Sequence, residues 1–378
     1  MDGPLDFWVS NDTAKIWVVD TYNNKVKVAT LAPSSGGVPA YGPWEDLAGS
    51  GEIGFQDGDA ATASFYQPHG LAVAESAGYA YVSDTFASCI RSISLRTGAV
   101  KTIAGTCGQG GHRDFPGSAG GGALGSSGRS GSALDARFNH VHKVTLDPRN
   151  ESLLYVSDVE CSDDGPLHIE ELCRKTYNNT IFTGVRRLEI SSKDGGCTSV
   201  STVAGYYDPS NPTADHPLGF ADGPIETAKF HYIHGVAFQP LSEAEKATLQ
   251  HGGHGSRGST AMYACDDDNF AIRKIDFVAK NVTTLAGTGT QGCADGDGAH
   301  ATLGAVGLGL GEDGTIYVAD YLNHRIRQLS IGGRALQSTY TVRDRVERQR
   351  DSSEARFFPP RQRGIFLKLR SRTPLKGT

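Results

Sequence analysis

Short apolar runs separated by turn residues dominate the chain, and the clearest set lies between residues 57 and 105. This segment opens with Asp57-Gly58 and continues to Phe65. Four apolar runs follow, rich in Val, Ile, Tyr and Leu and bounded by Gly, Asp, Ser or Thr, at 70–74, 79–82, 89–95 and 99–104. Runs of this length and composition predict β-strands joined by tight turns. The segment therefore predicts one unit of about four antiparallel strands.

The same order of landmarks recurs along the chain. Further copies open at Phe138, at Asp222-Gly223 and at Asp295-Gly296, and a shorter copy without the opening motif includes Ile16 to Asp20. Repeats of about fifty residues with four strands each predict a β-propeller. We count five blades in this all-β chain and expect the first and the last to be incomplete. Residues 335–342 are the candidate for a closing fourth strand.

The run from Tyr317 to Arg327, with the Asp-Gly openings and the Leu285-Ala286-Gly287 ending of another copy, resembles the NHL repeat. The resemblance covers roughly residues 5 to 331. It implies a propeller of four-stranded antiparallel blades, usually six of them. This sequence departs from that pattern by showing five.

The repeats divide the chain into a propeller, residues 1–340, and a tail, residues 341–378. Loops that lack the repeat landmarks are inserted at 106–131, 159–183 and 239–260. In the third, Ser242-Glu-Ala-Glu245 is a capping-box pattern and predicts a short surface helix. Inserted loops commonly carry binding specificity, so we expect a protein partner to bind there.

Charge separates these two parts. The tail holds eleven Lys or Arg against four acidic residues, which leaves the remainder with 25 basic and 38 acidic residues, or a net charge of −13. The tail lacks repeat landmarks and predicts a disordered basic segment. An acidic propeller is poorly matched to nucleic acid, whose binding relies on Lys and Arg, so RNA binding is only the third functional alternative.

One His recurs at the same position in three copies. FYQPHGLAV, FNHVHKVTL and FHYIHGVAF place His69, His142 and His234 four residues after Phe. Equivalent positions in a propeller converge near its axis, and three imidazoles could hold Zn²⁺ with an open fourth position. His69 in Gln67-Pro68-His69-Gly70 resembles the zinc-binding His of peptidyl-hydroxyglycine lyase, which is built on the same type of propeller. The alternative is that His is a tolerated polar residue at the channel mouth.

Two other residue types recur in register, and we expect both to be structural. An Asp ends the second strand of each copy, where it could accept hydrogen bonds from the following turn. A basic residue stands in the next strand, where it could pair with a neighbouring blade. The positions are Asp20, Asp84, Asp158, Asp266 and Asp320, and Lys27, Arg91, Arg186, Arg273 and Arg327.

Asp266, Asp267 and Asp268 form an acidic cluster whose oxygen atoms suit Ca²⁺, although a solvated acidic turn is the simpler interpretation. The sequence has no recognisable Ser or Cys nucleophile motif. We therefore expect a non-enzymatic interaction scaffold without a cofactor. The alternative is a metal-dependent propeller enzyme, either zinc lyase-like or calcium lactonase-like.

The compartment is left open by the sequence. The N-terminus lacks the basic region and apolar core of a signal peptide and no apolar run is long enough to span a membrane, so the chain as written predicts a cytoplasmic protein. Four glycosylation sequons, at Asn11, Asn150, Asn178 and Asn281, and a candidate disulfide between Cys161 and Cys173 point instead to an extracellular protein or ectodomain.

Overall fold

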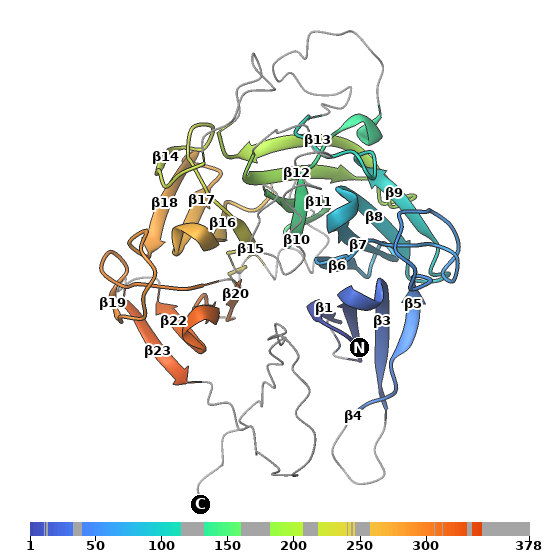
Figure 1. Ribbon diagram of the computed structural model, residues 1–378, viewed down its shortest axis with the longest axis horizontal. Helices are drawn as coiled ribbons and strands as arrows, with labels where there is room; N and C mark the ends of the chain where they lie inside the picture. The colour runs from blue at the N-terminus through green and yellow to red at the C-terminus, as the bar shows by residue number, and fades with distance from the viewer. Residues whose placement is uncertain are drawn as a thin grey trace, which may run out of the picture.

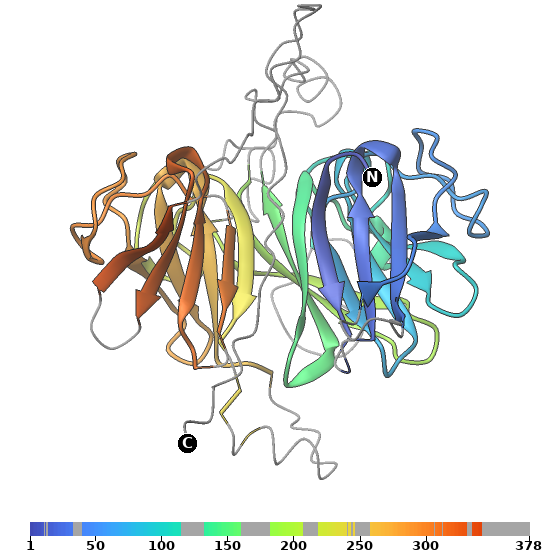
Figure 2. The ribbon, with the colours of Figure 1, turned by 90° about the horizontal axis from the view of Figure 1, so that it is seen from below.

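The computed structural model describes residues 1–10, 12, 14–32, 40–114, 132–159, 182–206, 218–239, 241–242, 245, 258–305, 307–311, 313–330 and 335–341. Within these ranges the strands form five antiparallel sheets, which follow one another around a central axis (Figure 1). We call the sheets blades 1 to 5. Seen from below, the strands of each blade run from one face of the molecule to the other (Figure 2). The all-β propeller predicted from the repeats is confirmed.

The strands of the blades have these bounds. Blade 1 comprises β1 (Pro4–Val9), β2 (Lys15–Asp20), β3 (Lys25–Ala32), β4 (Ala40–Tyr41) and β5 (Glu45–Ala48). Blade 2 comprises β6 (Leu71–Ala74), β7 (Tyr79–Asp84), β8 (Cys89–Ser94) and β9 (Val100–Ala104). Blade 3 comprises β10 (His140–Asp147), β11 (Asn150–Val159), β12 (Gly184–Ile190) and β13 (Cys197–Ala204).

The remaining two blades each begin with a two-residue strand. Blade 4 comprises β14 (Gly223–Pro224), β15 (Ile233–Phe238), β16 (Ala261–Asp266), β17 (Ala271–Asp276) and β18 (Asn281–Ala286). Blade 5 comprises β19 (Gly296–Asp297), β20 (Gly307–Leu310), β21 (Ile316–Asp320), β22 (Arg325–Ser330) and β23 (Ala335–Thr341). β14 and β19 come from the Asp-Gly motifs and pair with β18 and β23.

Blades 1 and 5 each contain four strands of at least four residues, so the expectation that both were incomplete is wrong. β1 pairs with β2 although no Asp-Gly motif precedes it. β23 covers the candidate closing strand and pairs with β22 inside blade 5. β1 is stabilised by its hydrogen bonds to β2 and not by an opening motif. The repeat pattern alone therefore did not predict it.

Apolar side chains fill the spaces between successive blades. Each interface centres on the large apolar residue of an opening motif: Phe65 between blades 1 and 2, Phe138 between blades 2 and 3, Phe230 between blades 3 and 4, and Leu303 between blades 4 and 5. Because both faces of an inner blade are covered, its strands read as nearly continuous apolar runs rather than as an alternation of apolar and polar residues.

A short 3-10 turn joins the second and third long strands of four blades. These turns are η1 (Thr21–Asn23), η2 (Thr85–Ala87), η4 (Asp267–Asn269) and η5 (Tyr321–Asn323). The residue after each turn is left-handed: Asn24, Ser88, Phe270 and His324 have φ of 51°, 56°, 47° and 52°. These four turns lie on one face of the propeller. We call the face that carries η1, η2, η4 and η5 the turn face.

Several sequence predictions fall outside the described residues. They are the Cys161–Cys173 disulfide, residues 342–378 of the tail, and most of the three insertions. Ser242 and Glu245 are described, and they make the two reciprocal hydrogen bonds of the expected capping box. Glu245 also pairs with Arg149 of blade 3 at 2.6 Å, which attaches the start of the third insertion to that blade.

Candidate functional site

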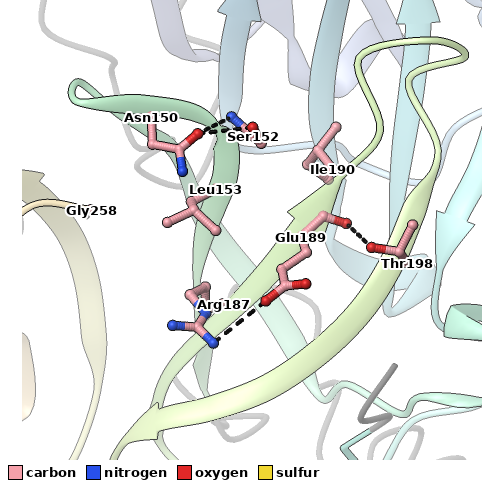
Figure 3. A pocket seen from close by; sticks show the side chains of 8 residues that line it. All are labelled: Asn150, Ser152, Leu153, Arg187, Glu189, Ile190, Thr198 and Gly258. Carbon is pink, nitrogen blue, oxygen red and sulfur yellow. Dashed lines mark hydrogen bonds and ion pairs between the residues drawn. The ribbon is translucent and has the colours of Figure 1, made fainter. Parts of the chain in front are cut away.

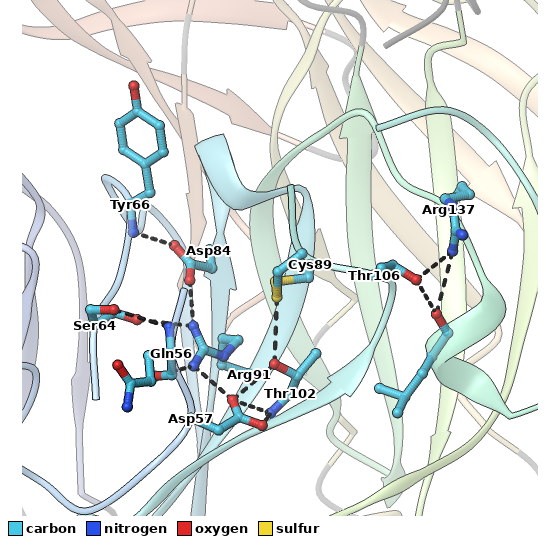
Figure 4. Close-up of a disulfide and its surroundings, with 12 residues drawn as sticks. Gln56, Asp57, Ser64, Tyr66, Asp84, Cys89, Arg91, Thr102, Thr106 and Arg137 are labelled. Atoms are coloured by element: carbon cyan, nitrogen blue, oxygen red, sulfur yellow. Dashed lines mark hydrogen bonds and ion pairs between the residues drawn. A yellow bond between two sulfur atoms is a disulfide. The ribbon is translucent and has the colours of Figure 1, made fainter. Parts of the chain in front are cut away.

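The recurring Asp and Arg residues form a buried clamp inside each of blades 2 to 5. In blade 2, Arg91 donates from Nη1 to Asp84 at 2.7 Å and from Nη2 to Asp57 at 2.8 Å (Figure 4). The equivalent trios are Arg186 with Asp158 and Asp114, Arg273 with Asp266 and Asp222, and Arg327 with Asp320 and Asp295. The clamp joins the opening motif of a repeat to its own second and third strands.

Two details of the sequence prediction need correction. Asp84 accepts the N–H of Tyr66, in the loop that leads into its blade, at 2.7 Å, and the backbone of the following turn makes no such bond. The arginines pair within their own repeat rather than with a neighbouring blade. In blade 3 the opening carboxylate is Asp114. Phe follows it in the sequence, so the Asp-Gly motif is absent from this repeat.

The three recurring histidines come together near the propeller axis. His69 Nδ1 and His142 Nδ1 are 3.3 Å apart, and the rings of His142 and His234 have centroids 5.0 Å apart. The other ring nitrogen of His142, Nε2, lies 2.7 Å from the hydroxyl oxygen of Tyr232. A hydrogen-bonded chain therefore runs from Tyr232 through His142 to His69.

Burial keeps the imidazoles of His69, His140 and His142 uncharged. It lowers the pKa of His69 to about 3, with further contributions from His234 and His140. It also lowers the pKa of His140 to about 4 and places that of His142 well below its usual value. Two neutral imidazoles can share the bond between their Nδ1 atoms only if one ring carries its proton on Nδ1 and the other on Nε2.

Sequence reasoning missed three members of this cluster. His140 and Tyr232 stand two residues before His142 and His234, at the position that Gln67 occupies in blade 2. Phe86 of η2 packs against His140 with ring centroids 4.8 Å apart. The repeated spacing would have identified the first two, whereas Phe86 joins the cluster only through the packing of blade 2 on blade 3. We call His69, Phe86, His140, His142, Tyr232 and His234 the channel-mouth cluster.

The acidic trio is divided between two environments. Asp266 belongs to the buried clamp of blade 4, where Arg273 and Asn269 bind its carboxylate. Burial and the neighbouring Asp268 raise the pKa of Asp267 to about 7. Asp268 lies 3.7 Å from His231. Within the described ranges, no three or more His, Cys, Asp or Glu side chains are grouped so as to hold a metal ion.

A disulfide joins Cys89 of β8 to Cys107 in the loop after β9 (Figure 4). It joins the first residue of β8 to the loop that follows β9, eighteen residues away, and the sequence offered no signal for it. Among the described cysteines, Cys197, Cys265 and Cys293 are free thiols.

A polar cavity of about 440 Å³ lies where β11 begins and β12 ends, at the end of blade 3 opposite His140. Figure 3 shows the side chains that line it. It is lined by Asn150, Ser152, Leu153, Arg187, Glu189, Ile190, Thr198 and Gly258. Arg187 and Glu189 face each other across 3.7 Å, so the two charged groups of the cavity largely neutralise one another. The cavity offers neither a nucleophile paired with a base nor a set of convergent donors, and the channel-mouth cluster is the better candidate site.

The chain is similar to known proteins in sequence and in fold. No family model matches the chain. The chain is 29% identical over 298 residues to protein SUPPRESSOR OF QUENCHING 1, chloroplastic, of Arabidopsis thaliana, which covers 75% of this chain and 27% of that protein. It is 28% identical over 309 residues to NHL repeat-containing protein 2 of Homo sapiens, which covers 74% of this chain and 41% of that protein. The chain thus spans less than half the length of either relative.

Among solved structures, an auxiliary nutrient binding protein from Bacteroides ovatus aligns with a TM-score of 0.52 and 16% identity over 86% of this chain and 58% of its own. That likeness shows a shared fold. The blades and their repeated Asp–Arg clamp define a β-propeller assembled from sequence repeats. The chain is an NHL-repeat propeller, as the relatives named NHL repeat-containing protein 2 indicate.

The described part of the chain contains no helix of the length and apolar character needed to cross a lipid bilayer.

Proposed function

We propose that this propeller is a non-catalytic protein-binding module and that its binding surface is the turn face around the channel-mouth cluster. The observation that carries the proposal is the convergence of aromatic and uncharged imidazole side chains from blades 2, 3 and 4 on one face. Aromatic groups with one polar atom are well suited to protein recognition, because they bury much apolar area and still make a directed hydrogen bond.

Exposed apolar side chains extend this surface beyond the cluster. Tyr22 of η1 and Leu322 of η5 are both exposed although each belongs to a turn on this face. The first two insertions begin at the ends of β9 and β11, which lie on the turn face, and would add contacts there. The third begins at the end of β15, on the opposite face. A folded partner or a peptide with apolar side chains would fit this surface.

The test compares proteins captured by the full chain with those captured by a Tyr22→Ala/Leu322→Ala variant. Val278→Ala is the matched control, because Val278 is exposed in the turn between β17 and β18, at the opposite end of the strands. We expect partners that bind the wild type and the control to bind the double variant about tenfold more weakly or not at all. Equal capture by all three proteins would remove the turn face as the binding surface.

A second candidate function, a metal-dependent enzyme, has one observation in its favour. The 3.3 Å separation of the Nδ1 atoms of His69 and His142 is close to the edge of a zinc tetrahedron, about 3.3 Å for Zn–N bonds of about 2.0 Å. Against it, these atoms face each other and Tyr232 binds the remaining nitrogen of His142. Zinc would have to replace the hydrogen bond between the imidazoles. A calcium site would have to use Asp267 and Asp268 without Asp266.

Elemental analysis separates the two candidates. Full-length protein purified without an affinity metal is compared with a His69→Ala/His142→Ala/His234→Ala variant of confirmed folding. The binding-module proposal expects no stoichiometric zinc or calcium in either. Near-stoichiometric zinc that is lost in the variant would instead favour the enzyme, and substrate screening would follow.

A further inference from the structure

The centre of each 3-10 turn presents one side chain on the turn face. Because the turns occupy the same point of the repeat, these side chains form an arc around the propeller axis. They are Tyr22, Phe86, Asp268 and Leu322, each two residues after the recurring Asp of its blade. Phe86 packs on His140, so the arc is continuous with the channel-mouth cluster. Apolar side chains fill every position of the arc except that of blade 4.

The blade 4 position carries a negative charge beside the cluster. The side chain of Asp268 is 35% exposed. The backbone N–H of Asp267 donates to Tyr232 O at 2.7 Å, which holds η4 against the cluster. Burial, then Asp268 and Asp266, raise the pKa of Asp267 to about 7, so a cation bound nearby would stabilise its ionised form. The surface thus combines aromatic rings with two carboxylates, a combination that suits a basic peptide with aromatic residues.

The chain itself contains a segment of this chemistry. Residues 355–378 hold seven Lys or Arg and no Asp or Glu. Three Phe and several aliphatic residues stand between these charges. Residues 341–378 as a whole carry a net charge of +7 and the remainder of the chain −13, so the two parts attract each other.

This segment follows a strand that ends on the turn face. β23 ends at Thr341, which pairs with Arg325, and Arg325 begins β22 directly beyond η5. The chain from Thr341 to Arg356 can span about 50 Å, whereas a domain of about 340 residues has a radius of gyration of about 20 Å. Residues 355–378 can therefore reach any part of the turn face. The covalent connection raises their effective concentration there to the order of millimolar.

We propose that residues 355–378 dock on the turn face of the same molecule, with arginines against Asp267 and Asp268 and phenylalanines on the arc and the channel-mouth cluster. Guanidinium groups form charge-assisted hydrogen bonds with carboxylates and stack on aromatic rings, so one segment can use both features of the surface. The docked segment competes with the protein partner, which must displace it. This inference rests on the proposed function only in placing both ligands on the turn face.

The test titrates a fluorescent synthetic peptide of residues 355–373 into the full chain and measures fluorescence anisotropy. In the wild type the covalent segment occupies the surface, and we expect weak binding of the peptide. The tail variant, Arg361→Gln/Arg363→Gln/Arg370→Gln/Arg372→Gln, loses four of the docking charges and leaves the surface open. We expect it to bind the peptide at least tenfold more tightly than the wild type does.

Two pairs of substitutions, each added to the tail variant, locate the site. Asp267→Asn/Asp268→Asn should lower the affinity for the peptide at least tenfold. Glu151→Gln/Asp194→Asn is the matched control, because it removes two exposed carboxylates at the opposite end of blade 3, and should leave the affinity unchanged. Circular dichroism spectra matching that of the wild type show that the variants are folded.

Three results would overturn the proposal. They are equal peptide affinity of the wild type and the tail variant, equal effects of the two carboxylate pairs, and weak binding by the wild type that disappears on dilution, which would assign the segment to a second copy. A failure of the proposed function looks different. The peptide results then stand, while Tyr22→Ala/Leu322→Ala leaves the capture of partners unchanged.

Discussion

At the scale of single residues, the Asp–Arg clamps show how charged side chains are accommodated by ion pairing inside an all-β core. Burial raises the pKa of Asp84 to about 6 and that of Asp158 to about 7, although Arg91 and Arg186 lower them in part. A buried ion pair adds little over a well-packed apolar pair, but removing one partner leaves an uncompensated charge. The clamp thus makes each opening loop depend on the arginine beneath it.

Replacing one of these arginines should be costly. Arg91→Met leaves the carboxylate of Asp84 buried without its cation, and we expect the free energy of unfolding to fall by about 3–5 kcal/mol. Lys25→Met is the control, because Lys25 pairs with the partly exposed Asp46 at 2.6 Å, and should cost about 1 kcal/mol or less. Urea unfolding measures both, and equal losses would contradict the structural role of the clamp.

The channel-mouth histidines should make stability depend on pH. Below the usual pKa of 6.5 the unfolded chain binds protons on His69 and His142, while the folded protein does not until its much lower pKa values are reached. Their contribution is present above pH 6.5 and is lost as the pH falls toward 4, by about 1.4 kcal/mol per pH unit for each histidine.

The raised pKa values of Asp84 and Asp158 act in the opposite sense, because the folded protein binds those protons first. The measurement is therefore the difference in unfolding free energy between wild type and a His69→Gln/His142→Gln variant at pH 7, 6, 5 and 4. We expect the wild type to lose stability relative to the variant over this range. A constant difference would show that these imidazoles are not buried in the uncharged form.

At the scale of elements, the disulfide fixes the start of a loop that completes the next blade. Cys107 is tied to β8, and a few residues later Arg113 O and Asp114 bind the guanidinium of Arg186 in blade 3. Arg113 and Asp114 thus do in blade 3 what Gln56 and Asp57 do in blade 2. The loop couples the two blades through backbone and side chain together.

Loss of this disulfide should increase local opening at residues 108–114 more than in the strands of the blades. For Cys107→Ser we expect a loss of about 2–4 kcal/mol, because the cross-link no longer restricts the unfolded chain, and faster amide exchange at residues 108–114. Cys293→Ser, at an exposed free thiol, is the control and should change neither. Unchanged exchange in residues 108–114 of the Cys107→Ser variant would show that the clamp alone holds the loop.

At the scale of the whole molecule, four interfaces between successive blades hold the described strands in one array. Within the described residues, no contact of comparable extent joins β20 to β1, so blades 1 and 5 pack against one neighbouring blade where blades 2 to 4 pack against two. We expect amide exchange to be faster in β2 and β21 than in β7 and β11, because less packing holds the end blades closed. Hydrogen exchange read by mass spectrometry measures it, and equal protection of the four strands would contradict this expectation.

The sequence by itself determined the repeat, the strands of the inner blades and the convergence of His69, His142 and His234. These follow from local patterning and from rotational equivalence, since residues at one position of a repeat must lie at one radius and height in a propeller. The same logic extends to the aromatic residue three positions before the recurring Asp, which blades 1 to 4 bury against the next blade: Trp17, Tyr81, Tyr155 and Tyr263.

Only the tertiary structure decided which partners those residues take. Asp114 could replace the Asp-Gly carboxylate because a loop folds back onto Arg186, and Cys89 met Cys107 because sheet pairing brings them together. The same packing buried Tyr81 and left Tyr317 exposed, although the two tyrosines stand at the same point of their repeats. Whether a neighbouring blade covers a face is a property of the array, and no local pattern encodes it.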